Sequence, residues 1–354
     1  MTINFILPFA GNKPIGGFKI IYEYANRLSE RGHKVNLIHP SYTFKENIFN
    51  NSKYFISYYY RKLSQSYFPD WFELNKNVNV MWIRSIENRY IPDADVLIAS
   101  AWRTAKCSSS LDPNKGKKFY FIQGYETWNG PEDEVNETWR LPYRKIVISK
   151  WLKEIAETMG EKADYIPNGL DFGEFGIDIN PKDRNPNKVM MLYNELKFKG
   201  CDSGISAMIE LKKRVSDLQA VLFGVPERPD TLPGWIEYHK SPDRKLLRRL
   251  YNESAIFISP SLTEGFGLTS AEAMMCGSAL AASFTGGHKE FAIEKETALT
   301  FEPGNVNQII EKVLFLINDN DLRIGLAMQG NKFIQKFTWE KAVNSFEKVL
   351  QETV

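Results

Sequence analysis

Residues 259–277 read SPSLTEGFGLTSAEAMMCG, and the rest of the chain is interpreted outward from this segment. The apolar, β-branched run at 255–258 predicts a buried strand, and the Ala-, Glu- and Met-rich run after the turn predicts a helix that ends at Gly277. Gly265 and Gly267 lie between the two and permit a tight turn that a ligand can approach closely. The first amides of a helix lack intrahelical acceptors, so this turn predicts an anion site, with phosphate as the usual anion.

Two carboxylates, Glu264 and Glu272, flank this turn and stand eight positions apart. The acid and nucleophile of a retaining glycosidase lie about 5 Å apart, whereas eight helical residues span roughly 12 Å. The spacing better suits an elongated ligand, such as a nucleotide diphosphate sugar, whose two ends meet different carboxylates. A structural interpretation stands beside this one, because Thr269 and Glu272 also fit a capping box with Thr269 as the N-cap. Glu264, between Thr263 and Gly265, has no evident structural role.

The E-x7-E pattern in EGFGLTSAEAM resembles the donor-site signature of retaining glycosyltransferases of family four, which have the GT-B architecture. The resemblance continues in YIPNGLD at 165–171, in Lys-Gly at 199–200 and in GG-x-x-E at 286–290, and it covers nearly the whole chain. It implies an α/β fold of two doubly wound Rossmann-like domains facing across a cleft. It also implies a nucleotide diphosphate sugar as donor substrate, no further cofactor and no metal, and retention of the donor's anomeric configuration.

Two other function classes stay open beside a transferase of surface polysaccharide or glycoconjugate biosynthesis. A nucleotide-sugar epimerase shares this architecture and releases an altered sugar without an acceptor. A noncatalytic carbohydrate-binding subunit would keep the fold without the chemistry. Family members commonly carry an Arg six residues before the Lys of the Lys-Gly pair, and here that position is Tyr193, which favours keeping the noncatalytic alternative.

The composition sets limits on the kind of protein. The chain has 354 residues, enough for two domains, and 43% are hydrophobic. Its net charge of +2 does not indicate a nucleic-acid partner, and we expect none. The three cysteines and four histidines show no metal-ligand spacing. With no long apolar run and no leader pattern, we expect a cytoplasmic protein without a transmembrane segment.

The order of predicted elements places the domains. A strand at 3–7, a Gly-containing loop at 10–17, a helix at 18–31 and a strand at 35–38 open a parallel, doubly wound domain. We expect an acceptor-side domain at 1–171, a donor domain at 172–337 and a final helix at 338–354 that crosses back to the first domain. The aromatic stretch at 54–67 is interpreted as a helix that covers the sheet, with a peripheral membrane patch as the alternative.

The resemblance carries roles onto individual residues. It implies that Glu264 orients the donor sugar hydroxyls and that Lys199 offsets the charge on the departing diphosphate. Lys197 could stand in for the missing Arg if it shares a face with Lys199, as it would on an extended stretch but not on a helical turn. It further implies that Tyr125 and Glu126 contact the acceptor. The residues expected to bind the donor are Gly16, Gly17, Lys197, Gly265, Phe266, Gly267, Leu268 and Glu272.

Overall fold

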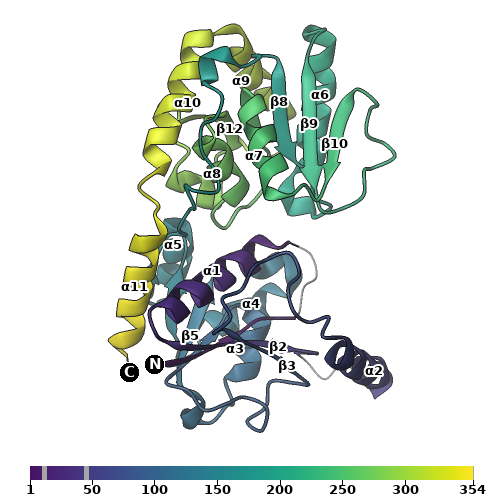
Figure 1. The fold of residues 1–354 in the computed structure, drawn as a ribbon. Helices are drawn as coiled ribbons and strands as arrows, with labels where there is room; N and C mark the ends of the chain where they lie inside the picture. Colours follow the sequence, from purple (N-terminus) through teal and green to yellow (C-terminus); the bar gives the residue numbers. More distant parts are fainter. Residues whose placement is uncertain (10–13, 44–47, 354) are drawn as a thin grey trace. The chain divides into compact units, whose positions relative to one another are not determined.

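The computed structural model describes residues 1–9, 14–43 and 48–353, with side chains left out at 48–55. The chain forms two compact units, each an α/β unit with one parallel sheet, and this confirms the predicted fold class (Figure 1). The N-terminal unit comprises Met1–Pro167 and Glu340–Val354, and the C-terminal unit comprises Asn168–Trp339. The predicted boundaries were after residues 171 and 337. Part of the Gly-rich loop predicted at 10–17 lies outside the described residues.

The sheet of the N-terminal unit has seven strands in the order β3-β2-β1-β4-β5-β6-β7. Its central pairings are parallel, and Phe5 of β1 is in register with Leu37 of β2 on one side and Ile98 of β4 on the other. The strands are β1 Thr2–Ile6, β2 Lys34–Pro40, β3 Asn79–Ile83, β4 Val96–Ala99, β5 Lys117–Ile122, β6 Arg144–Val147 and β7 Ala163–Tyr165. The helices are α1 Gly16–Glu30, α2 Ile48–Ser64, α3 Trp102–Ser108, α4 Glu132–Trp139 and α5 Lys150–Thr158, with the short 3-10 helices η1 Pro113–Lys115 and η2 Glu126–Asn129.

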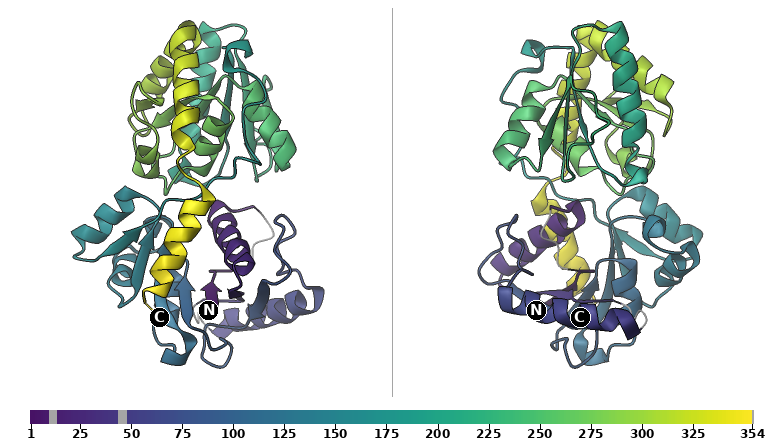
Figure 2. Two further views of the ribbon diagram at one scale, coloured as in Figure 1. Left: turned by 60° about the vertical axis from the view of Figure 1, so that its left-hand side comes forward. Right: turned by 90° about the vertical axis from the view of Figure 1, so that its right-hand side faces the viewer.

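The last helix, α11 (Trp339–Gln351), completes the N-terminal unit (Figure 2). Its buried Phe346 stacks on Tyr24 of α1, with ring centroids 4.3 Å apart, and meets the edge of Phe121 of β5. Its acidic residues pair with the same unit, since Glu347 bonds Arg31 at 2.6 Å. The final helix therefore supplies part of the hydrophobic core of the unit in which the chain begins.

The sheet of the C-terminal unit has six parallel strands in the order β10-β9-β8-β11-β12-β13. The strands are β8 Lys188–Leu192, β9 Gln219–Gly224, β10 Ile236–Lys240, β11 Ile256–Ser259, β12 Ala279–Ser283 and β13 Ala298–Phe301. The helices are α6 Cys201–Arg214, α7 Arg244–Glu253, α8 Leu268–Met275, α9 Val306–Asn318 and α10 Asn320–Ile334, with the 3-10 helices η3 Pro181–Asp183, η4 Lys197–Lys199 and η5 Gly286–Glu290.

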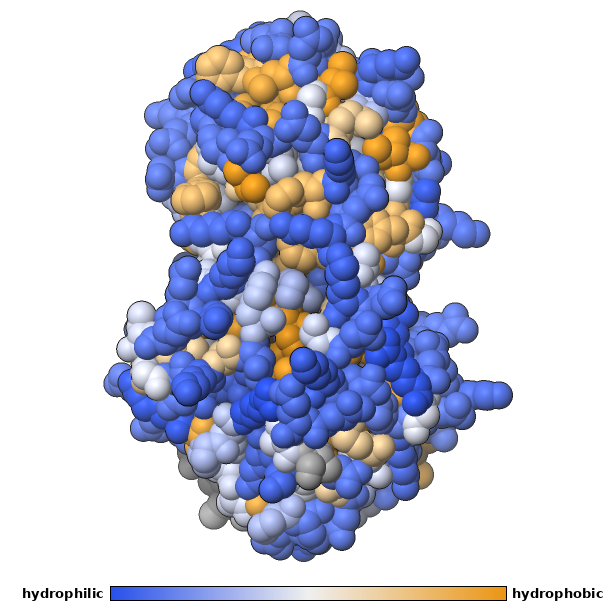
Figure 3. Space-filling model, turned by 90° about the vertical axis from the view of Figure 1, so that its left-hand side faces the viewer, coloured by the Kyte–Doolittle hydropathy of each residue, from blue (hydrophilic) through white to orange (hydrophobic). Residues whose placement is uncertain are grey.

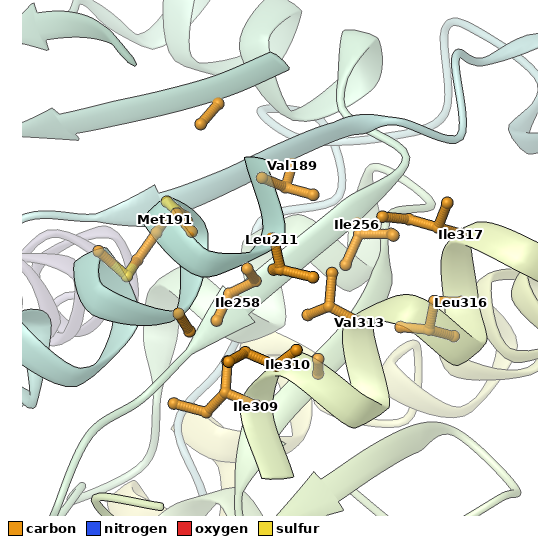
Figure 4. Packing of buried hydrophobic residues seen from close by; sticks show 14 of the residues in the cluster. Val189, Met191, Leu211, Ile256, Ile258, Ile309, Ile310, Val313, Leu316 and Ile317 are labelled. Atoms are coloured by element: carbon orange, nitrogen blue, oxygen red, sulfur yellow. The ribbon is translucent and has the colours of Figure 1, made fainter. Parts of the chain in front are cut away.

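Apolar side chains are concentrated inside the units. The surface drawn in Figure 3 is mainly hydrophilic, with apolar residues in small patches. In the core of the C-terminal unit, Val189 and Ile256 of neighbouring strands pack with Leu211 of α6 and Val313 of α9, and all four are fully buried (Figure 4). Parallel strands covered on both faces need apolar residues along their whole length, which explains the short continuous runs that predicted them.

The strand order reverses direction between β8 and β11 in the C-terminal unit. In open parallel sheets, ligands bind outside the carboxyl ends of the strands at such a reversal. The segment after β8 contains Lys199, and the segment after β11 contains Glu264 to Gly267. The sheet topology therefore brings together the two stretches that the sequence analysis singled out.

Candidate functional site

The turn after β11 ends in a glycine that starts a helix without a cap. Helix α8 begins at Leu268, and its N-cap Gly267 has φ +95° and no side-chain cap. A Cβ at Gly267 would lie 2.8 Å from Cδ2 of His288, so both the conformation and the space require glycine. The first amides of α8 therefore stay open to a ligand anion. The capping box considered as an alternative does not form, because Thr269 lies inside the helix and Gly267 is its N-cap.

A second glycine pair holds this turn in place. The amide of Gly287, in η5, donates to the carbonyl of Glu264 at 2.7 Å. A Cβ at Gly287 would collide with the backbone of Gly265 and Phe266, so η5 lies directly against the turn. The side chain of Phe266 is buried and packs against Phe291. Phe266 can thus meet a ligand only through its backbone.

Glu264 and Lys199 form an ion pair at the ends of adjacent strands. Lys199 Nζ donates to both carboxylate oxygens of Glu264, at 2.8 and 3.0 Å, and the Ser261 hydroxyl donates to one of them at 3.1 Å. The side chains of Lys199 and Glu264 are 19% and 14% exposed. Burial alone would raise the pKa of Glu264, but Lys199, His288 and Ser261 together outweigh it and the pKa lies below its usual range. The carboxylate is therefore ionised and held in one orientation at neutral pH.

Gly200 positions Lys199. It has φ +62°, starts α6 without a side-chain cap, and has no room for a Cβ against the carbonyl of Pro260. Lys197 and Lys199 belong to the helical turn η4, and Lys197 is exposed. The extended stretch that would have put both lysines on one face does not form. Lys199 is thus the lysine of this segment that pairs with Glu264.

Tyr193, at the position where the resemblance would place an Arg, forms an aromatic pair with Tyr238. The ring of Tyr193 meets the edge of Tyr238, with centroids 5.9 Å apart. The Tyr238 hydroxyl donates to the carbonyl of Pro226 at 2.6 Å. Burial raises the pKa of both phenols, to about 12 for Tyr238. Two neutral rings therefore lie next to each other, Tyr193 directly after β8 and Tyr238 inside β10.

His288, which the sequence analysis did not select, is fully buried beneath the turn. Its Nδ1 lies 3.0 Å from the carbonyl of Ser283, and its Nε2 lies 3.1 Å from the Ser259 hydroxyl and 3.2 Å from the Ser270 hydroxyl. A carbonyl can only accept, so Nδ1 carries the proton and Nε2 accepts. Burial lowers the pKa of His288, although Glu264 acts in the opposite direction. A neutral imidazole thus joins the ends of β11 and β12 to the start of α8.

Glu272 occupies the fifth position of α8 and is only 7% exposed. The hydroxyl of buried Tyr251 donates to its Oε2 at 3.3 Å. Because position five lies beyond the reach of a capping box, the structural explanation considered for Glu272 does not apply.

The remaining predicted residues lie in the N-terminal unit. Gly16 and Gly17 form the first turn of α1, two residues earlier than predicted, and the Gln123 amide donates to the carbonyl of Gly17 at 3.1 Å. The Tyr125 hydroxyl lies 2.8 Å from Oδ1 of Asn136. These residues follow strands β1 and β5, at the carboxyl edge of their sheet.

Glu126 has a structural contact. Its Oε2 accepts the amide of Trp102 at 2.7 Å, at the start of α3. Burial raises the pKa of Glu126 to about 7, with the Trp102 amide and the Arg103 guanidinium acting in the opposite direction. This carboxyl therefore titrates near neutral pH.

Neither a metal cluster nor a membrane span is found in the described part of the chain. Among residues 1–9, 14–43 and 48–353, no group of three or more His, Cys, Asp or Glu side chains could hold a metal ion. The helices of the same residues include none that is both long and apolar enough to cross a membrane.

Comparison with known proteins finds relatives of this chain. Residues 174–333 match the family model described as glycosyl transferases group 1. An uncharacterized glycosyltransferase of Methanocaldococcus jannaschii is 30% identical over 219 residues, which are 58% of this chain and 59% of that protein. A capsular polysaccharide biosynthesis glycosyltransferase of Staphylococcus aureus is 24% identical over 206 residues, 52% of this chain and 54% of that protein. The chain thus spans little more than half the length of these curated relatives.

Solved structures match over the full length. A sucrose-phosphate synthase from Thermosynechococcus elongatus superposes with a TM-score of 0.76 at 16% identity, covering 99% of this chain and 98% of that one. Anabaena HepE in complex with UDP and glucose superposes with a TM-score of 0.72 at 16% identity, covering 99% of this chain and all of that one. At this identity the likeness shows the fold.

Proposed function

We propose that the chain, whose residues 174–333 match the group 1 glycosyltransferase model and whose fold is that of GT-B enzymes, transfers a sugar, a hexose or deoxyhexose, from a nucleotide diphosphate sugar to a saccharide or lipid-linked saccharide acceptor. The observation that carries the proposal is the uncapped start of α8 beside the Lys199–Glu264 ion pair. An anion site next to a cation and an ionised carboxylate suits a ligand with a diphosphate and a polyhydroxyl group.

Each contact has a chemical role in this proposal. The amides from Gly265 to Leu268 bind phosphate oxygens. An ammonium has three N–H donors. Two of those of Lys199 bond the two carboxylate oxygens of Glu264, so the third remains for the diphosphate. Glu264 accepts hydrogen bonds from the sugar, and Glu272 from the ribose hydroxyls. Gly16 and Gly17 are proposed to bind the donor, and Tyr125 and Glu126 to contact the acceptor.

The state of Glu264 favours a particular reaction course. A carboxylate whose pKa is lowered by Lys199 is a poor general acid at neutral pH. We therefore propose that the acceptor oxygen bonds to the anomeric carbon on the face from which the diphosphate oxygen departs, so that the configuration is retained. The acceptor proton passes to the departing phosphate oxygen. Lys199 and the helix amides offset the charge that develops there, and this neutralisation needs no metal.

The cellular setting is also a proposal. The relative from Staphylococcus aureus is named for capsular polysaccharide biosynthesis, and we propose a role in surface polysaccharide or glycoconjugate biosynthesis in the cytoplasm, where nucleotide sugars are made.

A donor screen tests the proposal. Ligands that bind only the folded state raise its stability, by about 2.7 kcal/mol at a hundredfold excess over Kd. Thermal unfolding with UDP-, GDP-, dTDP- and ADP-sugars should show stabilisation by one nucleotide class. Slow acceptor-independent hydrolysis of that donor would support a transferase, and no stabilisation by any of them would contradict the donor site.

Tyr193 favours one second candidate, a noncatalytic carbohydrate-binding subunit, because no cation stands at its position. In that case the donor would bind but remain intact over long incubation. An epimerase would instead release an isomerised sugar without an acceptor. The same incubation, analysed by chromatography of the sugar products, separates the three functions.

A further inference from the structure

Helix α2 lies at the outer edge of the N-terminal unit, beside the edge strand β3 (Figures 1 and 2). One face of its described part is fixed there by Trp82 of β3, whose Nε1 donates to the carbonyl of Tyr58 at 3.0 Å. The ring of Trp82 also stacks with Tyr58 and Tyr67, and the Arg61 guanidinium lies 5.6 Å from its centroid. The helix is thus anchored through one face.

The opposite face of α2 is apolar and exposed. Ile56, Tyr60 and Leu63 are 69%, 69% and 86% exposed, and Tyr59 beside them is 47% exposed. Among the large apolar side chains of the described residues, these first three are the most exposed. Their spacing of four and three residues puts them on one stripe of the helix. A surface helix of a globular protein normally turns such a stripe toward the core. An apolar stripe that faces solvent instead indicates an interaction surface.

The charge of the segment indicates what that contact is. Residues 47–69 contain Lys53, Arg61 and Lys62 and no Asp or Glu. Cations beside exposed Tyr, Ile and Leu side chains characterise helices that lie in the plane of a membrane surface. Tyrosine rings favour the headgroup region, and Lys and Arg are attracted by anionic lipid.

We propose that α2 docks the protein on an anionic lipid bilayer, with Ile56, Tyr60 and Leu63 entering the boundary between headgroups and acyl chains. The contact is electrostatic and apolar at once, so it requires both the cations and the exposed stripe. The inference does not depend on the proposed sugar transfer, because it rests on residues of α2 and β3 alone.

Vesicle sedimentation of the full chain tests this docking. We expect binding to vesicles with about one third phosphatidylglycerol in phosphatidylcholine, and much weaker binding to phosphatidylcholine alone. The double variant Tyr60→Ser/Leu63→Ser should lose anionic-vesicle binding at least about tenfold, since it removes two exposed apolar side chains. Lys62→Gln should weaken binding to a smaller degree and reduce its dependence on salt.

A matched control is available in the C-terminal unit. Phe315 and Met328 are 53% and 46% exposed, and Phe315→Ser/Met328→Ser removes two exposed apolar side chains from outside α2. This control should bind like the unaltered chain. Equal sedimentation of both double variants would overturn the proposal. It would also be overturned if gel filtration showed a dimer that only Tyr60→Ser/Leu63→Ser dissociates, because the stripe would then contact a second copy. Unchanged thermal unfolding of each variant verifies that the fold is intact.

Discussion

Helices α7, α9 and α10 of the C-terminal unit begin under side-chain caps, whereas α6 and α8 begin at a bare glycine. Asp243, Asn305 and Asp319 each accept an amide hydrogen bond from the first turn of their helix. Gly200 and Gly267 adopt left-handed conformations and provide no side-chain cap. A cap contributes about 1 kcal/mol to stability. We propose that its absence at the two helices that follow β8 and β11 leaves these amides for a ligand, while the capped helix starts of the same unit serve the fold.

The largest expected effect comes from the ion pair between the two bare helix starts. Glu264→Gln keeps the shape but removes the charge that balances Lys199 and that we propose accepts hydrogen bonds from the sugar hydroxyls. We expect transfer or donor hydrolysis to fall by about 10²–10³, the usual effect of losing one preorganised polar contact. Glu227→Gln, at a side chain 81% exposed, is the control and should be neutral. Normal turnover of Glu264→Gln would mean that the site at the starts of α6 and α8 is not the catalytic site.

Gly267→Ala asks whether the uncapped start of α8 requires glycine. The left-handed conformation costs a residue with a Cβ about 1–2 kcal/mol, and this Cβ would also press on His288. We expect a stability loss above that range and donor binding weakened by more than about tenfold, because the amides shift. Gly32→Ala shares a positive φ, +86°, but meets nothing within 4 Å, so it should show the conformational cost alone. Chemical denaturation compares the two variants, and equal losses would argue against close packing at Gly267.

Removing a cap should affect stability and leave ligand binding unchanged. In Asp319→Ala the amide of Leu322 loses its acceptor, and we expect a loss of about 1 kcal/mol in the free energy of unfolding. Asp321→Ala, in the first turn of the same helix, removes a carboxylate but no cap and should lose less. A change in donor affinity on Asp319→Ala would contradict the proposal that capped helix starts stabilise the fold without taking part in donor binding.

The smallest expected effect is a change in pH dependence. His288 is neutral in the folded state, and burial holds its pKa below the usual 6.5. The unfolded chain therefore binds more protons between the two pKa values, so the stabilisation is complete above pH 6.5 and declines as the pH falls below it. His288→Gln cannot titrate and should flatten the slope of unfolding free energy between neutral and mildly acidic pH. An unchanged slope would mean that His288 does not contribute to it.

The sequence patterns predicted those parts of the fold that depend on local signals. The apolar run of β11 and the glycine that ends α8 are visible in the chain itself, and Gly277 has φ +78° after the last turn. Strand β7, with the sequence ADY and three partly exposed residues, has no such signal and was not predicted. The capping box considered at Thr269 does not form, because Gly267, held by tertiary packing, is the N-cap of α8.

The candidate site was predictable where a resemblance supplied it and not where it depends on packing. Lys199 and Glu264 are 65 residues apart and meet because β8 and β11 are neighbours in the sheet. Their roles came from the resemblance, and spacing alone would not have paired them. The partners of His288 come from three separate segments, at Ser259, Ser270 and Ser283, so no local pattern marks this residue.

The return of α11 to the N-terminal unit has a consequence for how the protein is made. The first 167 residues leave the ribosome long before residues 340–354, yet both belong to one compact unit. Until α11 has been synthesised, Tyr24 and Phe121 lack the ring of Phe346 that packs against them. Domains usually fold as units in the order of synthesis, but here the unit that emerges first cannot complete its core until α11, made after the whole C-terminal unit, has joined it.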